Sequence, residues 1–301
     1  MSPANKTSQL EEALAELERW VADPFNESFM FQRPFQALQM FSASRVEKIG
    51  KVLEGLTSLS TWYASVGIVE LCAGRSTDLL CDSFWCDFFH NTIMRLSFQR
   101  QKSRKRSFLD ELRGNRVRPT ISFTDQGLLL AKSLALGLVT EGEAIGQESL
   151  VGVKDGRFYG TSSKLTPFVL KVFAKWKQIA LPKEFAFDVP EPYQELIDNL
   201  TATADEILPA IRRACDFHLS RSKYHTKDET FEFAGPVKTV YPVDILYVCR
   251  IREILGLSNP EVDHPLMKTP LGKLPETPCS MGAALKPIHN AIRRDYPEWT
   301  G

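Results

Sequence analysis

One stretch of the sequence, residues 77–101 (TDLLCDSFWCDFFHNTIMRLSFQRQ), constrains the fold more than any other. Its apolar side chains cover most of the circumference of a helix drawn through the segment. A helix that is apolar on most of its sides is buried among other elements. We therefore expect a long central helix here, with other helices packed around it.

Many other segments carry apolar residues at intervals of three and four, the spacing of an amphipathic helix. In the first of them, Thr7 or Ser8 caps a helix in which Leu10, Leu14 and Leu17 recur. The same pattern predicts further helices over residues 33–41, 46–56, 59–72, 124–139, 167–180, 193–220 with an interruption at Pro209, 243–257 and 283–294. The sequence thus predicts a mainly α fold built as a layered helical array.

Clear β structure is expected at one place, Leu150 to Gly160 (LVGVKDGRFYG). The pair Asp155-Gly156 separates two short β-prone runs, and glycine accepts the positive φ that hairpin turns need. We therefore expect a small β-hairpin. A short extended segment is expected at Phe231 to Tyr241.

The segment Leu181 to Pro192 (LPKEFAFDVPEP) holds three prolines and is typical of a linker or a surface crossing. It places a domain boundary near residue 185. We expect a helical domain over residues 1–182, which includes the hairpin, and a helical C-terminal region over residues 191–301. The two can also form one continuous domain.

Composition narrows the class of protein. The 301 residues carry 37 basic and 37 acidic side chains, so no overall charge directs the chain to nucleic acid or a membrane, and self-association is expected. The N-terminus lacks the features of a secretory signal, and the most apolar run, Leu128 to Val139, is interrupted by Lys132 and too short to span a membrane. The 6 cysteines lack the spacing of a disulfide framework, which favours reduced thiols in the cytoplasm.

Two groups of side chains invite an enzymatic interpretation. Asp78, Asp82, Cys86 and His90 recur every four residues of the central helix and line one stripe of it. A second Cys/His pair with zinc-ligand spacing is missing, so we expect Cys86 to pack in the core and His90 to make one hydrogen bond.

The other group is His218 and His225, with Asp216 and Tyr224 nearby. General acid–base catalysis requires a histidine held against a carboxylate in a cleft. The spacing fits no metalloprotease or deaminase motif, so surface histidines at a helix C-terminus are expected. An enzyme that uses His218 and His225, or Cys86 and His90, stays as the alternative function.

In the proline-rich tail, His264 precedes Pro265 and should be extended. The following Leu266 and Met267 are expected to pin the tail to the core, which leaves His264 without a functional role. No metal site, cofactor or phosphate-binding glycine loop is predicted.

A basic run from Arg95 to Arg118 holds nine Lys and Arg residues against two acids. Clustered basic residues neutralise phosphates, and Phe98 and Phe108 are candidates to stack on bases. Because the chain is neutral and carries no nucleic-acid-binding motif, a solvated face is the expected interpretation. A nucleic-acid-binding regulator is the third candidate.

The opposite feature is an acidic stretch from Glu184 to Glu206, with seven acids against Lys183 alone. It suits a basic partner, such as the substrate groove of a nuclease, or it balances the basic run of the same chain. The sequence leaves both alternatives open.

The segment Val240 to Leu274 (VYPVDILYVCRIREILGLSNPEVDHPLMKTPLGKL) combines a Tyr-Pro helix start, an apolar helix, a Gly-Leu stop and a loop with His-Pro-Leu. This layout resembles the C-terminal part of α-helical immunity proteins of bacterial polymorphic toxin systems. The resemblance implies a non-enzymatic cytoplasmic protein that occludes a cognate toxin, in a setting such as type VI secretion. For a nuclease toxin, the expected contact residues are Glu184, Phe185, Phe187, Asp188, Glu191, Tyr193, Glu195 and Asp198.

Overall fold

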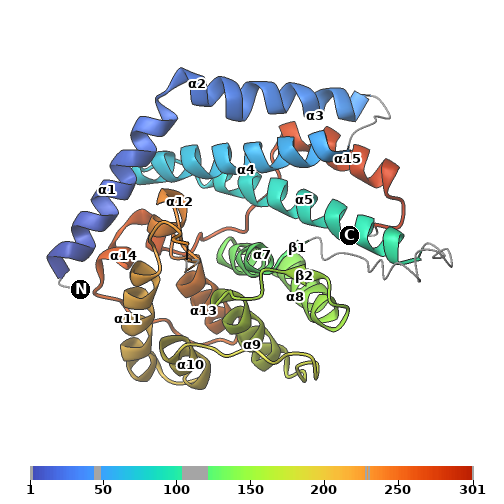
Figure 1. The fold of residues 1–301 in the computed structure, drawn as a ribbon. Coiled ribbons are helices and arrows are strands. Elements are labelled where there is room, and N and C mark those ends of the chain that lie inside the picture. The colour runs from blue at the N-terminus through green and yellow to red at the C-terminus, as the bar shows by residue number, and fades with distance from the viewer. Residues whose placement is uncertain (1–2, 44–48, 104–120, 228, 230, 300–301) are drawn as a thin grey trace.

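The computed structural model describes residues 3–43, 49–103, 121–227, 229 and 231–299, and it shows a mainly α protein (Figure 1). The two short strands are β1 (Ile121–Ser122) and β2 (Phe158–Tyr159). The helices are α1 (Pro3–Val21), α2 (Pro24–Glu27), η1 (Ser28–Gln32), α3 (Arg33–Ala43), α4 (Ile49–Cys72), α5 (Asp78–Ser103), α7 (Phe123–Ala135), α8 (Val139–Lys154), α9 (Leu165–Lys177), α10 (Glu191–Asp198), α11 (Ala204–Ser220), α12 (Pro236–Val240), α13 (Val243–Ile254), α14 (Pro265–Lys268), η2 (Pro270–Gly272), η3 (Ala283–Leu285) and α15 (Lys286–Asp295). The predicted fold class is confirmed.

The helices form two groups, as Figure 1 shows. Helices α3, α4, α5 and α15 lie along one another in the upper layer of that view, and α7 to α14 lie below them. Helix α1 connects the groups, because it packs against α4 in the first and against α12 and α14 in the second. Helix α5 packs against both α4 and α7, in agreement with the central position predicted for residues 77–101.

A smaller core fills the upper layer. Leu38 of α3, Leu56 of α4 and Phe89 of α5 are buried there. The C-terminal segment closes this core, because Ile292 of α15 is buried in it and the Trp299 ring lies 6.2 Å from that of Phe89. The predicted last helix is thus present, and it completes a core begun by the N-terminal third of the chain.

The larger core is continuous across the segment predicted as a linker. Phe168 of α9 and Tyr193 of α10 stack with ring centroids 4.1 Å apart, and Tyr247 of α13 donates a hydrogen bond to the Val169 carbonyl at 2.9 Å. These residues belong to one cluster that runs from Leu10 to Leu271. Residues before and after position 185 therefore share a core.

The β element differs from the predicted hairpin. Strands β1 and β2 pair in parallel, with Ile121 opposite Phe158, and residues 150–154 belong to helix α8. Asp155-Gly156 ends that helix instead of turning a hairpin: Gly156 takes a φ of +65° and the Arg157 amide bonds the Gly152 carbonyl at 2.9 Å. An Asp-Gly pair fits either role, because both require positive φ at glycine.

Helix α8 also carries glycines that the hairpin interpretation overlooked. Gly142, Gly146 and Gly152 lie on the side that packs against neighbouring side chains. A Cβ atom at Gly146 would lie 2.4 Å from the Phe173 ring of α9, so only glycine permits this approach. These glycines serve helix packing.

Three other predicted boundaries shift. Residues 46–56 and 59–72 lie largely in the single helix α4, and Pro236–Val240, expected to be extended, forms α12. The break predicted at Pro209 lies earlier, between α10 and α11, because Thr203 and Glu206 form a reciprocal capping box that starts α11. Pro209 is therefore inside that helix.

The expectation of six reduced cysteines is wrong for one pair. Cys81 of α5 and Cys279 of the C-terminal segment form a disulfide across 198 residues of sequence, a pairing that no local spacing reveals. Cys72, Cys86, Cys215 and Cys249 are free thiols. Among the described helices, none has the length and apolarity to cross a membrane.

Candidate functional site

A cavity of about 840 Å³ opens between the two helical groups. Helices α1, α4, α5 and α7 and the segment 234–243 contribute its walls. This volume lies within the range of pockets that hold small organic molecules. The cavity is therefore the main candidate for a ligand site within the described residues.

Much of the cavity wall is apolar. Leu17 and Trp20 of α1 line one side, Leu53 of α4 and Leu128 of α7 contribute further apolar surface, and Tyr159 of β2 adds an exposed ring. Apolar walls of this kind bury the body of a ligand, whereas a few polar groups fix its orientation.

The polar part of the wall centres on Lys132 of α7. Its ammonium group donates to Asp87 Oδ2 at 2.9 Å and to Ser83 Oγ at 2.7 Å, and the Ser83 hydroxyl donates to the Ser60 carbonyl at 2.8 Å. The Lys132 side chain is 14% exposed and that of Asp87 39%. A single lysine in a buried apolar helix needs a polar partner. The sequence showed Lys132 in an apolar run, but it did not show that Asp87 is its partner.

His90 lies one helical turn after Asp87 on α5 and also lines the cavity. Burial lowers the pKa of His90, while Asp87 and Asp125 act in the opposite direction. No described residue forms a hydrogen bond with the His90 ring, so the single hydrogen bond expected from the sequence is missing. The imidazole is thus an uncommitted polar group at the cavity wall.

The predicted stripe on α5 does not form one site. Cys86 is fully buried in the smaller core, where burial raises the pKa of its thiol well above the usual range, as suits inert packing. Asp82 Oδ1 accepts a hydrogen bond from the Gly282 amide at 2.8 Å and holds the C-terminal segment. Only His90 of this stripe lines the cavity.

His218 is not a surface histidine, contrary to expectation. Its side chain is 0% exposed, and its Nδ1 lies 2.8 Å from Asp244 Oδ1 of α13. Its Nε2 faces the Lys238 carbonyl at 3.0 Å, and its ring stacks on Phe233 at 3.8 Å. The side chain was predicted at the surface because its partners come from segments distant in the sequence.

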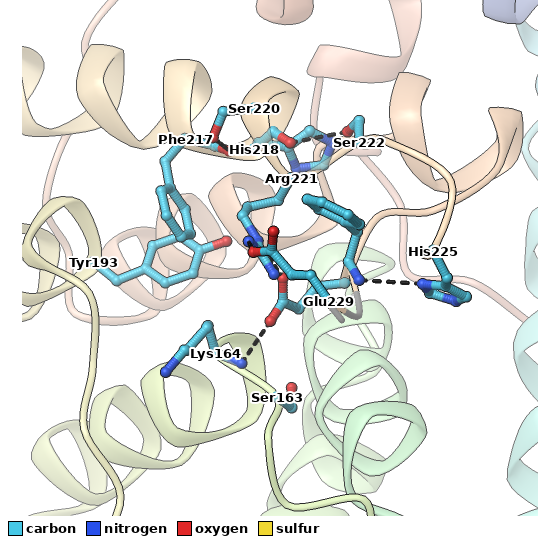
Figure 2. Close-up of polar contacts among 12 residues, drawn as sticks. Ser163, Lys164, Tyr193, Phe217, His218, Ser220, Arg221, Ser222, His225 and Glu229 are labelled. Atoms are coloured by element: carbon cyan, nitrogen blue, oxygen red, sulfur yellow. Dashed lines mark hydrogen bonds and ion pairs between the residues drawn. The ribbon is translucent and has the colours of Figure 1, made fainter. Parts of the chain in front are cut away.

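Asp244 connects this histidine to Tyr193. The Tyr193 hydroxyl donates to Asp244 Oδ2 at 2.7 Å. Figure 2 shows Tyr193 beside Phe217, against which it packs edge-on. Tyr193, Asp244 and His218 are each 0% exposed, and burial and the adjacent Asp244 raise the pKa of the Tyr193 hydroxyl. This Tyr–Asp–His cluster is sealed from solvent, so its structural role is to hold α10, α11 and α13 together.

The remaining histidine candidates lie apart from it. Figure 2 shows His225 away from His218, where its Nδ1 accepts a hydrogen bond from the Phe231 amide at 3.1 Å. His264 has the extended backbone predicted for it, caps α14, and contacts Asp216 at 3.4 Å, while Leu266 is fully buried as expected. The structure therefore does not bring His218 and His225 together into an active site.

The predicted acidic contact residues divide into two sets. Glu184, Asp188, Glu191 and Asp198 are exposed, whereas Glu195 pairs with Arg213. Among the predicted aromatic anchors, Tyr193 is buried and unavailable to a partner. Phe185 and Phe187 are half-buried and pack on each other with centroids 5.1 Å apart, which directs them partly to the core.

The described part of the basic run is neutralised elsewhere. Arg95 pairs with Glu148, Arg100 with Glu298 and Lys102 with Asp155. Phe98 is 2% exposed, so it is not available to stack on a base. Residues 104–120, with Phe108 and the rest of the run, lie outside the described residues.

In the described parts of the chain, no group of three or more His, Cys, Asp or Glu side chains is arranged to hold a metal ion. Comparison with known proteins adds no relative: no family model, curated protein or solved structure matches this chain.

Proposed function

We propose that this chain is an immunity protein that binds one cognate bacterial toxin and occludes its active site. The observation that carries the proposal is an acidic surface, which we define as Glu184, Asp188, Glu191 and Asp198, all exposed on α10 and the segment before it. No described basic side chain forms an ion pair with any of the four. Arg95, Arg100 and Lys102, the described members of the basic run, pair with other acids, which supports an acidic surface available to a partner.

A surface of this kind suits a toxin with a basic groove. Complementary charge speeds association, and the bound acidic surface then covers a groove that binds phosphates. The scaffold beneath the surface is rigid, because Leu196 and Ile197 of α10 are buried in the larger core. We also propose a cytoplasmic location. Alkylation of protein taken directly from cells tests this location, because it shows whether Cys81 and Cys279 are free thiols, as the cytoplasm favours, or joined in the disulfide.

The first experiment is a pull-down of the tagged full-length chain from its own cells, with mass spectrometry and stoichiometry. A one-to-one partner with a toxin-like domain is expected. Recovery of no protein partner would overturn the proposal.

The partner then allows a test of the surface. The triple substitution Glu184→Lys, Asp188→Lys and Glu191→Lys should slow association at low salt by roughly 10- to 100-fold, and added salt should reduce the difference. The matched control, Glu11→Lys, Glu18→Lys and Glu27→Lys, changes the net charge equally at exposed positions of α1 and α2. Equal rates for the two triple variants would remove the acidic surface from the interface.

A second surface is worth comparing in the same assay. Phe25 of α2 and Phe29 of η1 are 67% and 51% exposed, with ring centroids 5.8 Å apart. Helix α2 lies near the top of Figure 1, whereas α10 lies near the bottom. If Phe25→Ala with Phe29→Ala abolishes binding and the acidic triple does not, the interface belongs to α2.

A further inference from the structure

We infer that the cavity between the two helical groups binds an organic cation: a small molecule with a protonated amine and an apolar, ring-sized body. This site is independent of the proposed toxin surface, because none of Glu184, Asp188, Glu191 and Asp198 lines the cavity.

The carboxylates of the cavity outnumber its ammonium groups. Glu16, Asp87 and Asp125 line it, against Lys132 and Lys238. The Lys132–Asp87 ion pair removes one charge of each sign. Lys238 lies on α12, which packs against α1 and α4. Its positive charge therefore does not neutralise the carboxylate of Asp125 on α7. An anion would meet unpaired carboxylate at the α5–α7 wall.

The uncommitted atoms at this wall are hydrogen-bond acceptors. Lys132 donates a hydrogen bond to Asp87 Oδ2, and the other carboxylate oxygen of Asp87, Oδ1, has no hydrogen-bond partner among the described residues. The carboxylate of Asp125 likewise receives no hydrogen bond from any described group. Since burial lowers the pKa of His90, its ring is neutral near neutral pH and presents a lone pair. An ammonium group, with three donors and a positive charge, satisfies this set.

The rest of the cavity fits an apolar body. Trp20, Leu53 and Leu128 line it, and Trp20 lies against Trp62 with centroids 5.7 Å apart, which holds the indole in place. At the rim, the Tyr224 hydroxyl donates to Glu16 at 2.8 Å and links the segment after α11 to α1. Aromatic faces and carboxylates together are favourable surroundings for organic cations.

Two ligands with the same indole ring and opposite charge provide the test. Tryptamine should bind the purified full-length chain with a Kd of about 0.1–1 mM by calorimetry, whereas indole-3-propionate should bind at least about tenfold more weakly. Equal or tighter binding of the acid would overturn the inference. So would failure of tryptamine to bind at about 5 mM, several times the expected Kd.

Two variants place the site. Asp125→Asn, at an exposed position, should weaken tryptamine binding by roughly tenfold, whereas Asp188→Asn, on the acidic surface, should leave it unchanged. Thr61→Trp should block the cavity, because exposed Thr61 lines it, and Lys51→Trp places the same ring at another exposed position of α4. Thermal melting shows that each variant is folded. Tryptamine binding that is the same in wild type, Asp125→Asn and Thr61→Trp would overturn the assignment to this cavity.

Discussion

Two of the histidine clusters, those of His218 and His90, differ in their access to solvent. His218 is enclosed between α11 and α13, and both of its ring nitrogens face acceptors on Asp244 and the α12 backbone. His90 lines an open cavity, and no described group bonds its ring. The residue types are the same in both places, a histidine with an aspartate nearby, so composition does not separate them.

The difference teaches that a histidine–carboxylate pair has two opposite uses. Where every polar atom is paired and covered, the cluster defines the packing of its helices, because an unpaired atom there would cost free energy of folding. Where acceptors stay unpaired beside a cavity, the cluster is available to a ligand. Substitutions in the first cluster should therefore change stability, and those in the second should change binding.

The largest effect is expected at Asp244. Asp244→Ala leaves the His218 ring and the Tyr193 hydroxyl buried without their partner, so the free energy of unfolding should fall by about 3–5 kcal/mol. Urea denaturation measures this loss. His225→Ala, at an exposed histidine outside the cluster, is the control and should change stability by less than about 0.5 kcal/mol. A loss below about 1 kcal/mol for Asp244→Ala would show that the cluster contributes little to folding.

A smaller loss is expected when only the hydroxyl is removed. Tyr193→Phe keeps the ring stacked on Phe168 and deletes the hydrogen bond to Asp244, so stability should fall by about 1–2 kcal/mol. A double-mutant cycle with Asp244→Ala tests the coupling. Additive losses would mean that the two side chains do not act together.

Periodic features of this fold were predictable from the sequence. The central helix, the first helix and the final helix are set by apolar residues at helical spacing, and α5 follows the predicted range closely. The β element was misplaced because Asp155-Gly156 ends a helix as readily as it turns a hairpin. The local pattern favoured the hairpin, whereas the segment packs as a helix with Gly146 against Phe173.

The site was less predictable because its members are distant in the sequence. His90 and Lys132 were both visible as unusual residues in apolar helices, but Asp87 was not linked to Lys132, which is 45 residues away. For His218, the partner Asp244 is 26 residues away on a different helix. Helical spacing places residues on one face of a helix, whereas the identity of the facing helix is a property of the tertiary fold.

The dependence of stability on pH sharpens the comparison. Burial lowers the pKa of His90 from 6.5, so the unfolded chain takes up a proton at higher pH than the folded one. Stability should therefore decrease as the pH falls below about 6.5. His90→Gln should reduce this decrease in part, since burial lowers the pKa of His264 and His289 as well. Urea titrations of wild type and variant at about pH 7.5 and pH 5.5 measure it. Parallel curves would show that His90 does not contribute.

The smallest effect on folding is expected for His90→Gln at pH values above the pKa of the His90 ring. The His90 ring has no hydrogen-bond partner among the described residues, so its replacement should change the free energy of unfolding by less than about 0.5 kcal/mol. The same variant should nevertheless weaken tryptamine binding, by about threefold to tenfold, because the glutamine amide oxygen does not take the place of the imidazole nitrogen that accepts at the α5–α7 wall. Tyr193→Phe should show the reverse, with lower stability and unchanged binding. If His90→Gln lost as much stability as Tyr193→Phe and bound tryptamine normally, the distinction between a sealed and an open cluster would be wrong.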